Sequence, residues 1–209
     1  SCSGFDRGKI GLCQVRSAQW FGLIFIDLSN EAENFYDYIR PIDERWRDFK
    51  NVKLHHMGDD CTIEFELECN WKLAVENYCE AYHLPWVHPG LNSYSPLNRH
   101  YSIVEETYSG QGSDCYVPGV LPGTRAFPKA PDLPTFWSAG AEYIALYPNV
   151  LLGIHCDHFY AVLIHPRGTN RIRERVEIFY FDEIVSTPAF DAARAHNRDL
   201  WQRIFIEDR

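Results

Sequence analysis

The sequence predicts an α+β fold with antiparallel strands and a long C-terminal helix. Three observations lead to this prediction. Residues 62–69 alternate between apolar and polar side chains, as a half-exposed antiparallel strand does. Residues 143–152, 157–165 and 173–182 are further strand-like segments separated by turn residues. Residues 188–209 begin with Pro and contain no later helix breaker, which is typical of a long helix.

The N-terminal part predicts one strand and one surface helix. Residues 14–28 end in an apolar run rich in β-branched and aromatic side chains, which indicates a buried strand. Asn30 followed by Glu33 offers a capping box for a short helix. Pro41 is expected to end that helix near Ile39.

The segment after the alternating strand gathers ionisable side chains on a predicted helix. Nothing in residues 72–82 breaks a helix, so Glu76, Glu80 and His83 are expected at i, i+4 and i+7 on one face. That face is polar within a mostly apolar element. The pattern therefore indicates a site and not only a packing surface.

Two histidines are expected to meet where this helix ends. Pro85 should stop the helix just after His83, so that His88 can turn back toward it from the following turn. Two imidazoles and one carboxylate leave half of an octahedron open, which is the ligand arrangement of non-haem Fe(II) oxygenases. From the spacing alone, two such histidines are more often ordinary surface or core residues than metal ligands.

Residues 96–140 predict a long irregular segment. They hold six of the twelve prolines and five glycines, with aromatic side chains scattered between. Because this aromatic content argues against disorder, the segment is interpreted as a lid and cavity wall over the site, or else as a structural insertion remote from it.

Composition favours a globular protein whose partner is a small molecule. The chain has 209 residues, 45% hydrophobic, and a net charge of −9 without a long basic run, so no nucleic-acid partner is expected. Seven cysteines without paired spacing suggest reduced thiols. Without an apolar run near twenty residues or a signal-peptide pattern, we expect a cytoplasmic protein and no membrane partner.

Residues 70–72, 76–78 and 80–88 together resemble the iron motif of the Rieske-type ring-hydroxylating oxygenases. The resemblance implies that His83 and His88 bind a mononuclear iron and that Glu80 bridges the iron site to a Rieske cluster on a neighbouring subunit. Most ring-hydroxylating members carry Asp at the bridging position. Glutamate there is similar to the carnitine and choline monooxygenase-like branch.

The third iron ligand is implied to be the Asp of a Glu-Asp pair late in the C-terminal helix, which matches Asp208 after Glu207. Helix periodicity independently places Asp208 on the face of Leu200 and Ile204. Asp199, on another face, remains the alternative.

The resemblance covers essentially the whole chain as the catalytic domain of an oxygenase α subunit, residues 1–209. It implies a helix-grip (START-like) fold, in which an antiparallel sheet is wrapped on a long C-terminal helix, and an N-terminal Rieske domain with its [2Fe-2S] cluster that is absent from this chain. It also implies a homo-trimer and a reductase or ferredoxin as electron donor.

The function implied by the resemblance is O2-dependent mono- or dioxygenation at Fe(II), possibly with demethylation, of a quaternary amine or an aromatic compound. The alternative is a non-catalytic ligand-binding module, because helix-grip folds also serve as pockets without metal. A substrate cavity is expected to be lined by Tyr78, Tyr82, Trp86, His158 and Tyr160. Since Cys156 and His158 alternate along a strand, core packing is the other interpretation of His158.

Overall fold

The computed structural model describes residues 11–118, 120 and 122–209. The chain divides into two compact units, Ser1–Pro41 and Ile42–Arg209. The expectation that residues 1–209 act as one catalytic domain stays a prediction, and the units are described separately.

The described part of the first unit contains a β-hairpin instead of the single buried strand that we expected. β1 (Arg16–Trp20) pairs antiparallel with β2 (Leu23–Asp27). Phe21 and Gly22 both have positive φ, 47° and 73°, as the two central residues of a tight hairpin turn do. The apolar run hid this turn because only Gly22 marks it in the sequence.

Helix α1 (Phe35–Arg45) begins and ends later than the sequence predicted. The Asp27 carboxylate accepts hydrogen bonds from the backbone N–H groups of Ser29 and Asn30, so this stretch forms a turn. Asn34 instead caps the helix by accepting from the backbone N–H of Tyr36 at 2.9 Å. Pro41 lies inside α1 and does not end it.

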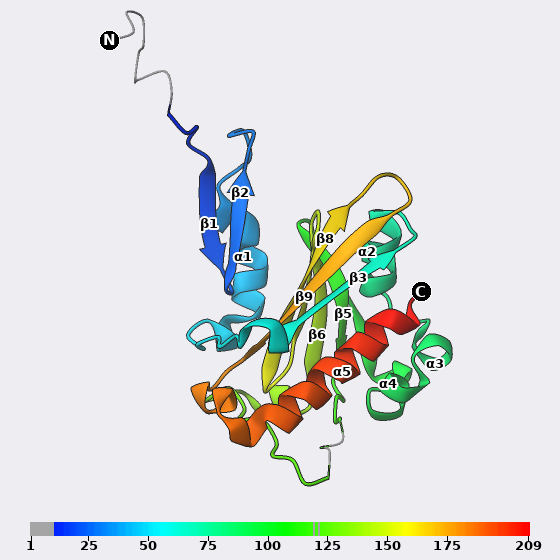
Figure 1. Ribbon diagram of the computed structural model, residues 1–209. Helices are drawn as coiled ribbons and strands as arrows, with labels where there is room; N and C mark the ends of the chain where they lie inside the picture. The colour runs from blue at the N-terminus through cyan, green and yellow to red at the C-terminus, as the bar shows by residue number, and fades with distance from the viewer. Residues whose placement is uncertain (1–10, 119, 121) are drawn as a thin grey trace, which may run out of the picture. The chain divides into compact units, whose positions relative to one another are not determined.

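The second unit is built on a seven-stranded antiparallel sheet, which confirms the predicted α+β class (Figure 1). The strand order is β3, β9, β8, β7, β6, β5, β4. In chain order the strands are β3 (Thr62–Leu67), β4 (His100–Val104), β5 (Tyr108–Ser113), β6 (Ala141–Leu146), β7 (Val150–Ile154), β8 (His158–Pro166) and β9 (Ile172–Tyr180).

Four of these strands were not distinguished individually by the sequence. The predicted strand 143–152 is the hairpin of β6 and β7, and both strands are buried throughout, so no polar alternation marks the turn between them. The segment 96–140, expected to be irregular, contains β4 and β5. β5 has low strand propensity because it consists largely of Gly and Ser.

The helices of this unit are α2 (Trp71–Cys79), α3 (Leu84–Val87), α4 (Pro89–Tyr94) and α5 (Asp191–Glu207). Figure 1 shows α5 running across the sheet, as the predicted C-terminal helix should. Trp201 and Phe205 of α5 pack on Tyr160 with ring centroids 4.5 and 5.6 Å apart. Short 3₁₀ turns complete the unit at Arg47–Phe49, Gly58–Cys61, Leu97–Arg99, Thr135–Ser138, Glu183–Ser186 and Pro188–Phe190.

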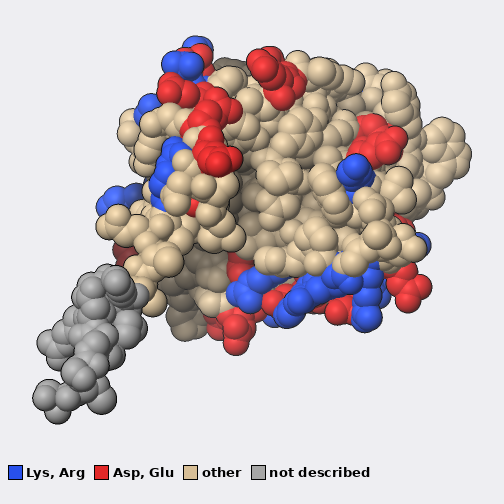
Figure 2. All heavy atoms as spheres, turned by 90° about the horizontal axis from the view of Figure 1, so that it is seen from above, with Lys and Arg blue, Asp and Glu red and all other residues tan. Residues whose placement is uncertain are grey.

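The surface charges are of mixed sign. In the view of Figure 2, Lys and Arg side chains lie beside Asp and Glu along one edge, and most of the remaining surface is uncharged. Ion pairs of this kind join β3 to β9, for example Arg175 to Glu64 at 3.0 Å. None of the described helices combines the length and apolar character needed to span a bilayer.

Candidate functional site

Helix α2 is shorter than the sequence predicted. Asn70 caps its start by accepting from the backbone N–H of Lys72 at 3.1 Å. The helix ends at Cys79, and Glu80 is extended with φ −120° and ψ 162°. The predicted helix to residue 82 is therefore wrong, and Glu76, Glu80 and His83 do not share one continuous helical face.

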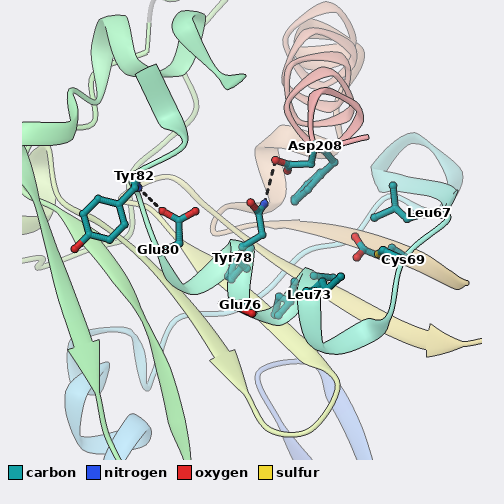
Figure 3. A pocket seen from close by; sticks show the side chains of 13 residues that line it. Leu67, Cys69, Leu73, Glu76, Tyr78, Glu80, Tyr82 and Asp208 are labelled. Atoms are coloured by element: carbon teal, nitrogen blue, oxygen red, sulfur yellow. Dashed lines mark hydrogen bonds between the residues drawn. The ribbon is translucent and has the colours of Figure 1, made fainter. Parts of the chain in front are cut away.

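Beyond Cys79, backbone N–H and C=O groups form hydrogen bonds with side chains and not with the next turn of the helix. The Glu80 carboxylate accepts from the backbone N–H of Tyr82, as Figure 3 shows, and the Gln111 amide donates to the Glu80 carbonyl at 2.8 Å. A local side-chain acceptor of this kind competes with helical hydrogen bonding. The same contacts fix the Glu80 carboxylate beside His83.

Pro85 begins a helix and does not stop one. It occupies the first turn of α3, where its missing N–H costs nothing because no partner lies within the helix. His83 precedes this single turn and His88 follows it, and the His88 backbone N–H bonds the Leu84 carbonyl at 2.9 Å. The two imidazole rings lie 5.0 Å apart, so the expected meeting of the histidines occurs through a different local structure.

Asp208 follows the last residue of α5 and lies beside both histidines. Its Oδ1 atom is 3.0 Å from His88 Nε2 and 3.8 Å from His83 Nε2, and the Asn77 amide donates to the same oxygen at 3.0 Å. One ligand atom from each of the three residues lies within 4.8 Å of the others. In the described part of the chain, this is the only such group of three or more His, Cys, Asp or Glu side chains.

Carboxylates fix the proton positions on both imidazoles. His83 Nδ1 lies 2.5 Å from Glu80 Oε1, and His88 Nδ1 lies 2.9 Å from Glu207 Oε2. Because an ionised carboxylate can only accept, each Nδ1 carries the proton and each Nε2 keeps its lone pair toward Asp208. This is the tautomer that a metal-binding histidine needs.

The arrangement requires a positive charge between His88 and Asp208. An unprotonated Nε2 and a carboxylate oxygen at 3.0 Å would face each other with lone pairs. Burial opposes a charge on His88, but hydrogen bonds to Asp208 and Glu207 outweigh it and raise the pKa of His88. A divalent cation can replace that proton, and two imidazoles with one carboxylate fit a borderline metal such as Fe(II).

Two of the five predicted cavity residues lie beside this group. Tyr78 and Tyr160 line a space of about 50 Å³ together with His83 and His88. The Tyr78 hydroxyl donates to that of Tyr160 at 3.1 Å. Their position agrees with a cavity wall next to the metal ligands.

Of the other three predicted cavity residues, Tyr82 lines a larger hollow that adjoins this space, whereas Trp86 and His158 line neither of the two. Trp86 is 79% exposed, because the opposite side of the one-turn helix α3 buries Leu84. Tyr82 is 75% exposed, and in Figure 3 its ring points away from the other labelled side chains, although it contributes to the rim of a hollow. His158 is buried elsewhere, where it accepts from Trp201 Nε1 at 2.9 Å and stacks on His155.

Several site residues were not singled out by the sequence. Gln111, on the Gly- and Ser-rich strand β5, had no signal. Asn77 lies within the iron motif, but nothing indicated its contact with Asp208. Glu174 did have a signal, because it interrupts the apolar face that Ile172 and Val176 form on β9. A buried carboxylate at such a position is uncommon without a partner.

Asp199, the alternative third ligand, does not lie in the group. It is exposed on α5 and pairs with Arg198 at 3.3 Å. Helix periodicity favoured Asp208 because it placed Asp199 on a different face from Leu200 and Ile204.

Known proteins resemble this chain in sequence. The family model described as the ring-hydroxylating α subunit (catalytic domain) matches residues 43–209. Putrescine 2-hydroxylase of Ralstonia nicotianae is 30% identical over 176 residues, which cover 79% of this chain and 45% of that protein. The chloroplastic choline monooxygenase of Arabidopsis thaliana is 24% identical over 213 residues, which cover 98% of this chain and 47% of that protein.

A solved structure shows the same fold. The quaternary ammonium Rieske monooxygenase CntA, in complex with an inhibitor, matches with a TM-score of 0.72 at 15% identity. The match covers 97% of this chain and 53% of that one, so the chain spans about half the length of the proteins that it matches. Since the family model extends from residue 43 to residue 209, the chain belongs to the family of ring-hydroxylating α subunits and carries its catalytic domain.

Proposed function

We propose that the chain holds a mononuclear Fe(II) with His83, His88 and Asp208 and hydroxylates a small organic substrate with O2. The observation that carries the proposal is the convergence of two Nε2 lone pairs and a carboxylate, with both tautomers fixed by Glu80 and Glu207. Bound Fe(II) would supply O2 activation, since three protein ligands leave coordination positions open.

The chain's own residues would orient the ligands and exclude water. Glu80 and Glu207 each accept the Nδ1 proton of one imidazole, and Asn77 donates to Asp208. Such partners orient ligands and raise the basicity of imidazole. His88 is 2% exposed, so its Nε2 lies in a site that bulk water barely reaches.

We propose an amine as the substrate, with an aromatic compound as the other option. The relatives are named for putrescine, choline and quaternary ammonium compounds, whereas the family is described as hydroxylating rings. The aromatic option follows from the family description and from the matching structures of naphthalene 1,2-dioxygenase. The relatives therefore favour an amine, either quaternary or carrying N–H groups.

The wider assembly is part of the same proposal. Electrons would come from a Rieske [2Fe-2S] cluster on a neighbouring subunit of a homo-trimer, fed by a reductase or ferredoxin, and would pass by Glu80 beside His83. A helix-grip arrangement of the sheet and α5 and a cytoplasmic location also remain proposals.

Metal uptake tests the proposal against a non-catalytic ligand-binding module. Anaerobically reconstituted protein should bind about one Fe(II), and His83→Ala and His88→Ala should lose it. Glu80→Gln keeps the shape and one acceptor oxygen, so iron occupancy should stay near that of the unmodified protein. Turnover in the assembled enzyme should fall by about tenfold to a hundredfold.

The controls separate ligation from folding. Asp199→Asn removes an exposed aspartate of the same helix and should leave iron uptake unchanged. Iron uptake that survives His83→Ala would exclude the proposed site. Normal turnover of Glu80→Gln would reduce Glu80 to a residue that only shapes the turn.

A further inference from the structure

A hollow of about 640 Å³ adjoins the proposed metal ligands (Figure 3). Asn77, Tyr78, Phe205 and Asp208 line both this hollow and the small space beside His83. Its volume lies in the range of small-molecule sites. A molecule bound in the hollow would therefore lie next to the proposed reaction centre.

The lining of this hollow is acidic and apolar. Its ionised side chains are carboxylates, and no Lys, Arg or His side chain belongs to it among the residues that the structure describes. The carboxylates are Glu76, Glu80, Glu174 and Asp208, and the apolar wall includes Leu67, Leu73, Leu151 and Phe205. Such a wall favours a cation with an aliphatic part.

Glu174 is the most buried of these carboxylates, and its side chain lines the hollow. It is 4% exposed on the inward face of β9, next to Ile172 and Val176. No described side chain or backbone group donates a hydrogen bond to it, whereas Glu80 and Asp208 are both bonded. Burial and, second, the nearby Asp208 carboxylate raise the pKa of Glu174 to about 7.

A buried carboxylate of this kind needs hydrogen-bond donors as well as positive charge. A second metal ion is a poor candidate, because Glu174 belongs to no group of three potential metal ligands among the described residues. A quaternary ammonium has no N–H to donate and is usually held by aromatic faces. Of the three aromatic residues that line the hollow, Tyr82 is largely exposed, so only Tyr78 and Phe205 offer enclosed aromatic faces.

We propose that Glu174 binds the protonated amine of a substrate that carries N–H groups, a primary or secondary ammonium, and so selects it over quaternary amines. The inference rests on the proposed function, because it names the substrate class of the same site. The apolar wall would contact the alkyl chain, and the hollow leads past Asp208 toward the proposed iron ligands. Glu174 is thus a specificity-determining residue.

Calorimetric binding tests this without turnover. Purified protein at pH 8 is titrated with 1,4-diaminobutane and with its fully N-methylated counterpart, which keeps both charges and has no N–H. We expect the diamine to bind at least tenfold more tightly. Glu174→Gln should lose at least tenfold in affinity for the diamine and little for the methylated compound.

A matched control separates contact from overall charge. Glu66→Gln removes one negative charge from the outward side of the same sheet, where Glu66 pairs with Arg171, and should change both affinities by less than threefold. Equal loss in the two variants, absence of diamine binding, or tighter binding of the methylated compound would overturn the proposal.

Iron uptake by Glu174→Gln is measured in parallel. Uptake should match that of the unmodified protein, which also shows that the variant folds. Diamine selectivity that persists in a protein without iron uptake supports the Glu174 assignment while the proposed oxygenase function fails. Iron uptake with unselective amine binding overturns only the assignment of Glu174.

Discussion

Two buried glutamates of the same sheet differ in their hydrogen-bond partners. Glu142 of β6 is 3% exposed and accepts from Arg45, from the Trp46 indole N–H at 2.7 Å and from the Tyr101 hydroxyl at 2.9 Å. Glu174 of β9 is 4% exposed and has no donor among the described residues. Burial alone therefore does not identify a functional carboxylate, whereas burial without a partner beside a hollow does.

Replacing each of these glutamates by Gln should change the free energy of unfolding in opposite directions. Glu142→Gln removes the charge that Arg45 faces and turns one acceptor oxygen into a donor. We expect the free energy of unfolding to fall by about 3 to 4 kcal/mol, since an unpaired buried charge is left. Chemical denaturation measures this. A loss below about 1 kcal/mol would mean that Arg45, whose side chain is 29% exposed, is solvated well enough without its partner.

Glu174→Gln should instead stabilise the metal-free protein at high pH. The pKa of Glu174 is about 7 in the folded state, against an ordinary value of 4.5. The folded state therefore binds the proton more tightly, and stability falls as pH rises through this window. The variant should match the unmodified protein near pH 4 and exceed it by about 3 kcal/mol at pH 8, because each unit of pKa difference corresponds to about 1.4 kcal/mol.

Denaturation in EDTA at a series of pH values measures this difference directly. The titration of His88 occurs in both proteins and cancels in the comparison. A variant that is less stable at pH 8 would show that Glu174 has a favourable partner in the folded state and would remove the contrast with Glu142.

Tyr101→Phe sharpens the comparison by removing a single donor to Glu142. One hydrogen bond to an ionised acceptor is lost, while Arg45 and Trp46 remain. The unfolding free energy should fall by about 1 to 2 kcal/mol. In a double-mutant cycle with Glu142→Gln, the two effects should be less than additive, because they share this contact.

Glu64→Gln should change the free energy of unfolding least of these substitutions and serves as the reference for an exposed glutamate. Glu64 pairs with Arg173 and Arg175 on the outward side of β3 and β9, where solvent screens the charges. Exposed pairs of this kind contribute little to stability. The denaturation midpoint should stay within measurement error, and a clear loss would indicate that the ion pairs between β3 and β9 act as a coupled network.

The sequence predicts most of this unit where side-chain periodicity is clear. β3 and β9 alternate clearly, β8 is an apolar run bounded by turn residues, and α5 is a long segment without a breaker; all four lie within a few residues of where they were expected. β5 was not predicted because its Gly and Ser residues are held in the sheet by β4 and β6 on either side, which is a tertiary effect. The turn between β6 and β7 was missed although Pro148 and Asn149 are typical turn residues, because the apolar residues on both sides were interpreted as one strand.

The site is predictable in composition but not in local geometry. The positions of His83, His88 and Asp208 were anticipated, and the structure brings them together, while their role as iron ligands remains a proposal. The end of α2 at Cys79 depends on Glu80 and Gln111, and Gln111 lies on a strand whose position the sequence did not reveal. Trp86 was wrongly expected in the cavity wall, because the one-turn helix α3 buries Leu84 and leaves Trp86 on its exposed side.

The position of Asp208 just after α5 has a consequence for how the protein unfolds. His83 and His88 lie between α2 and α4, and their partner Asp208 lies far away in the sequence. A cation bound by all three would act as a removable cross-link that closes a long loop of the chain. Because the unfolded chain cannot hold this geometry, the melting temperature should rise with the logarithm of free metal concentration, and fraying of the last turn of α5 should release the metal before the sheet opens.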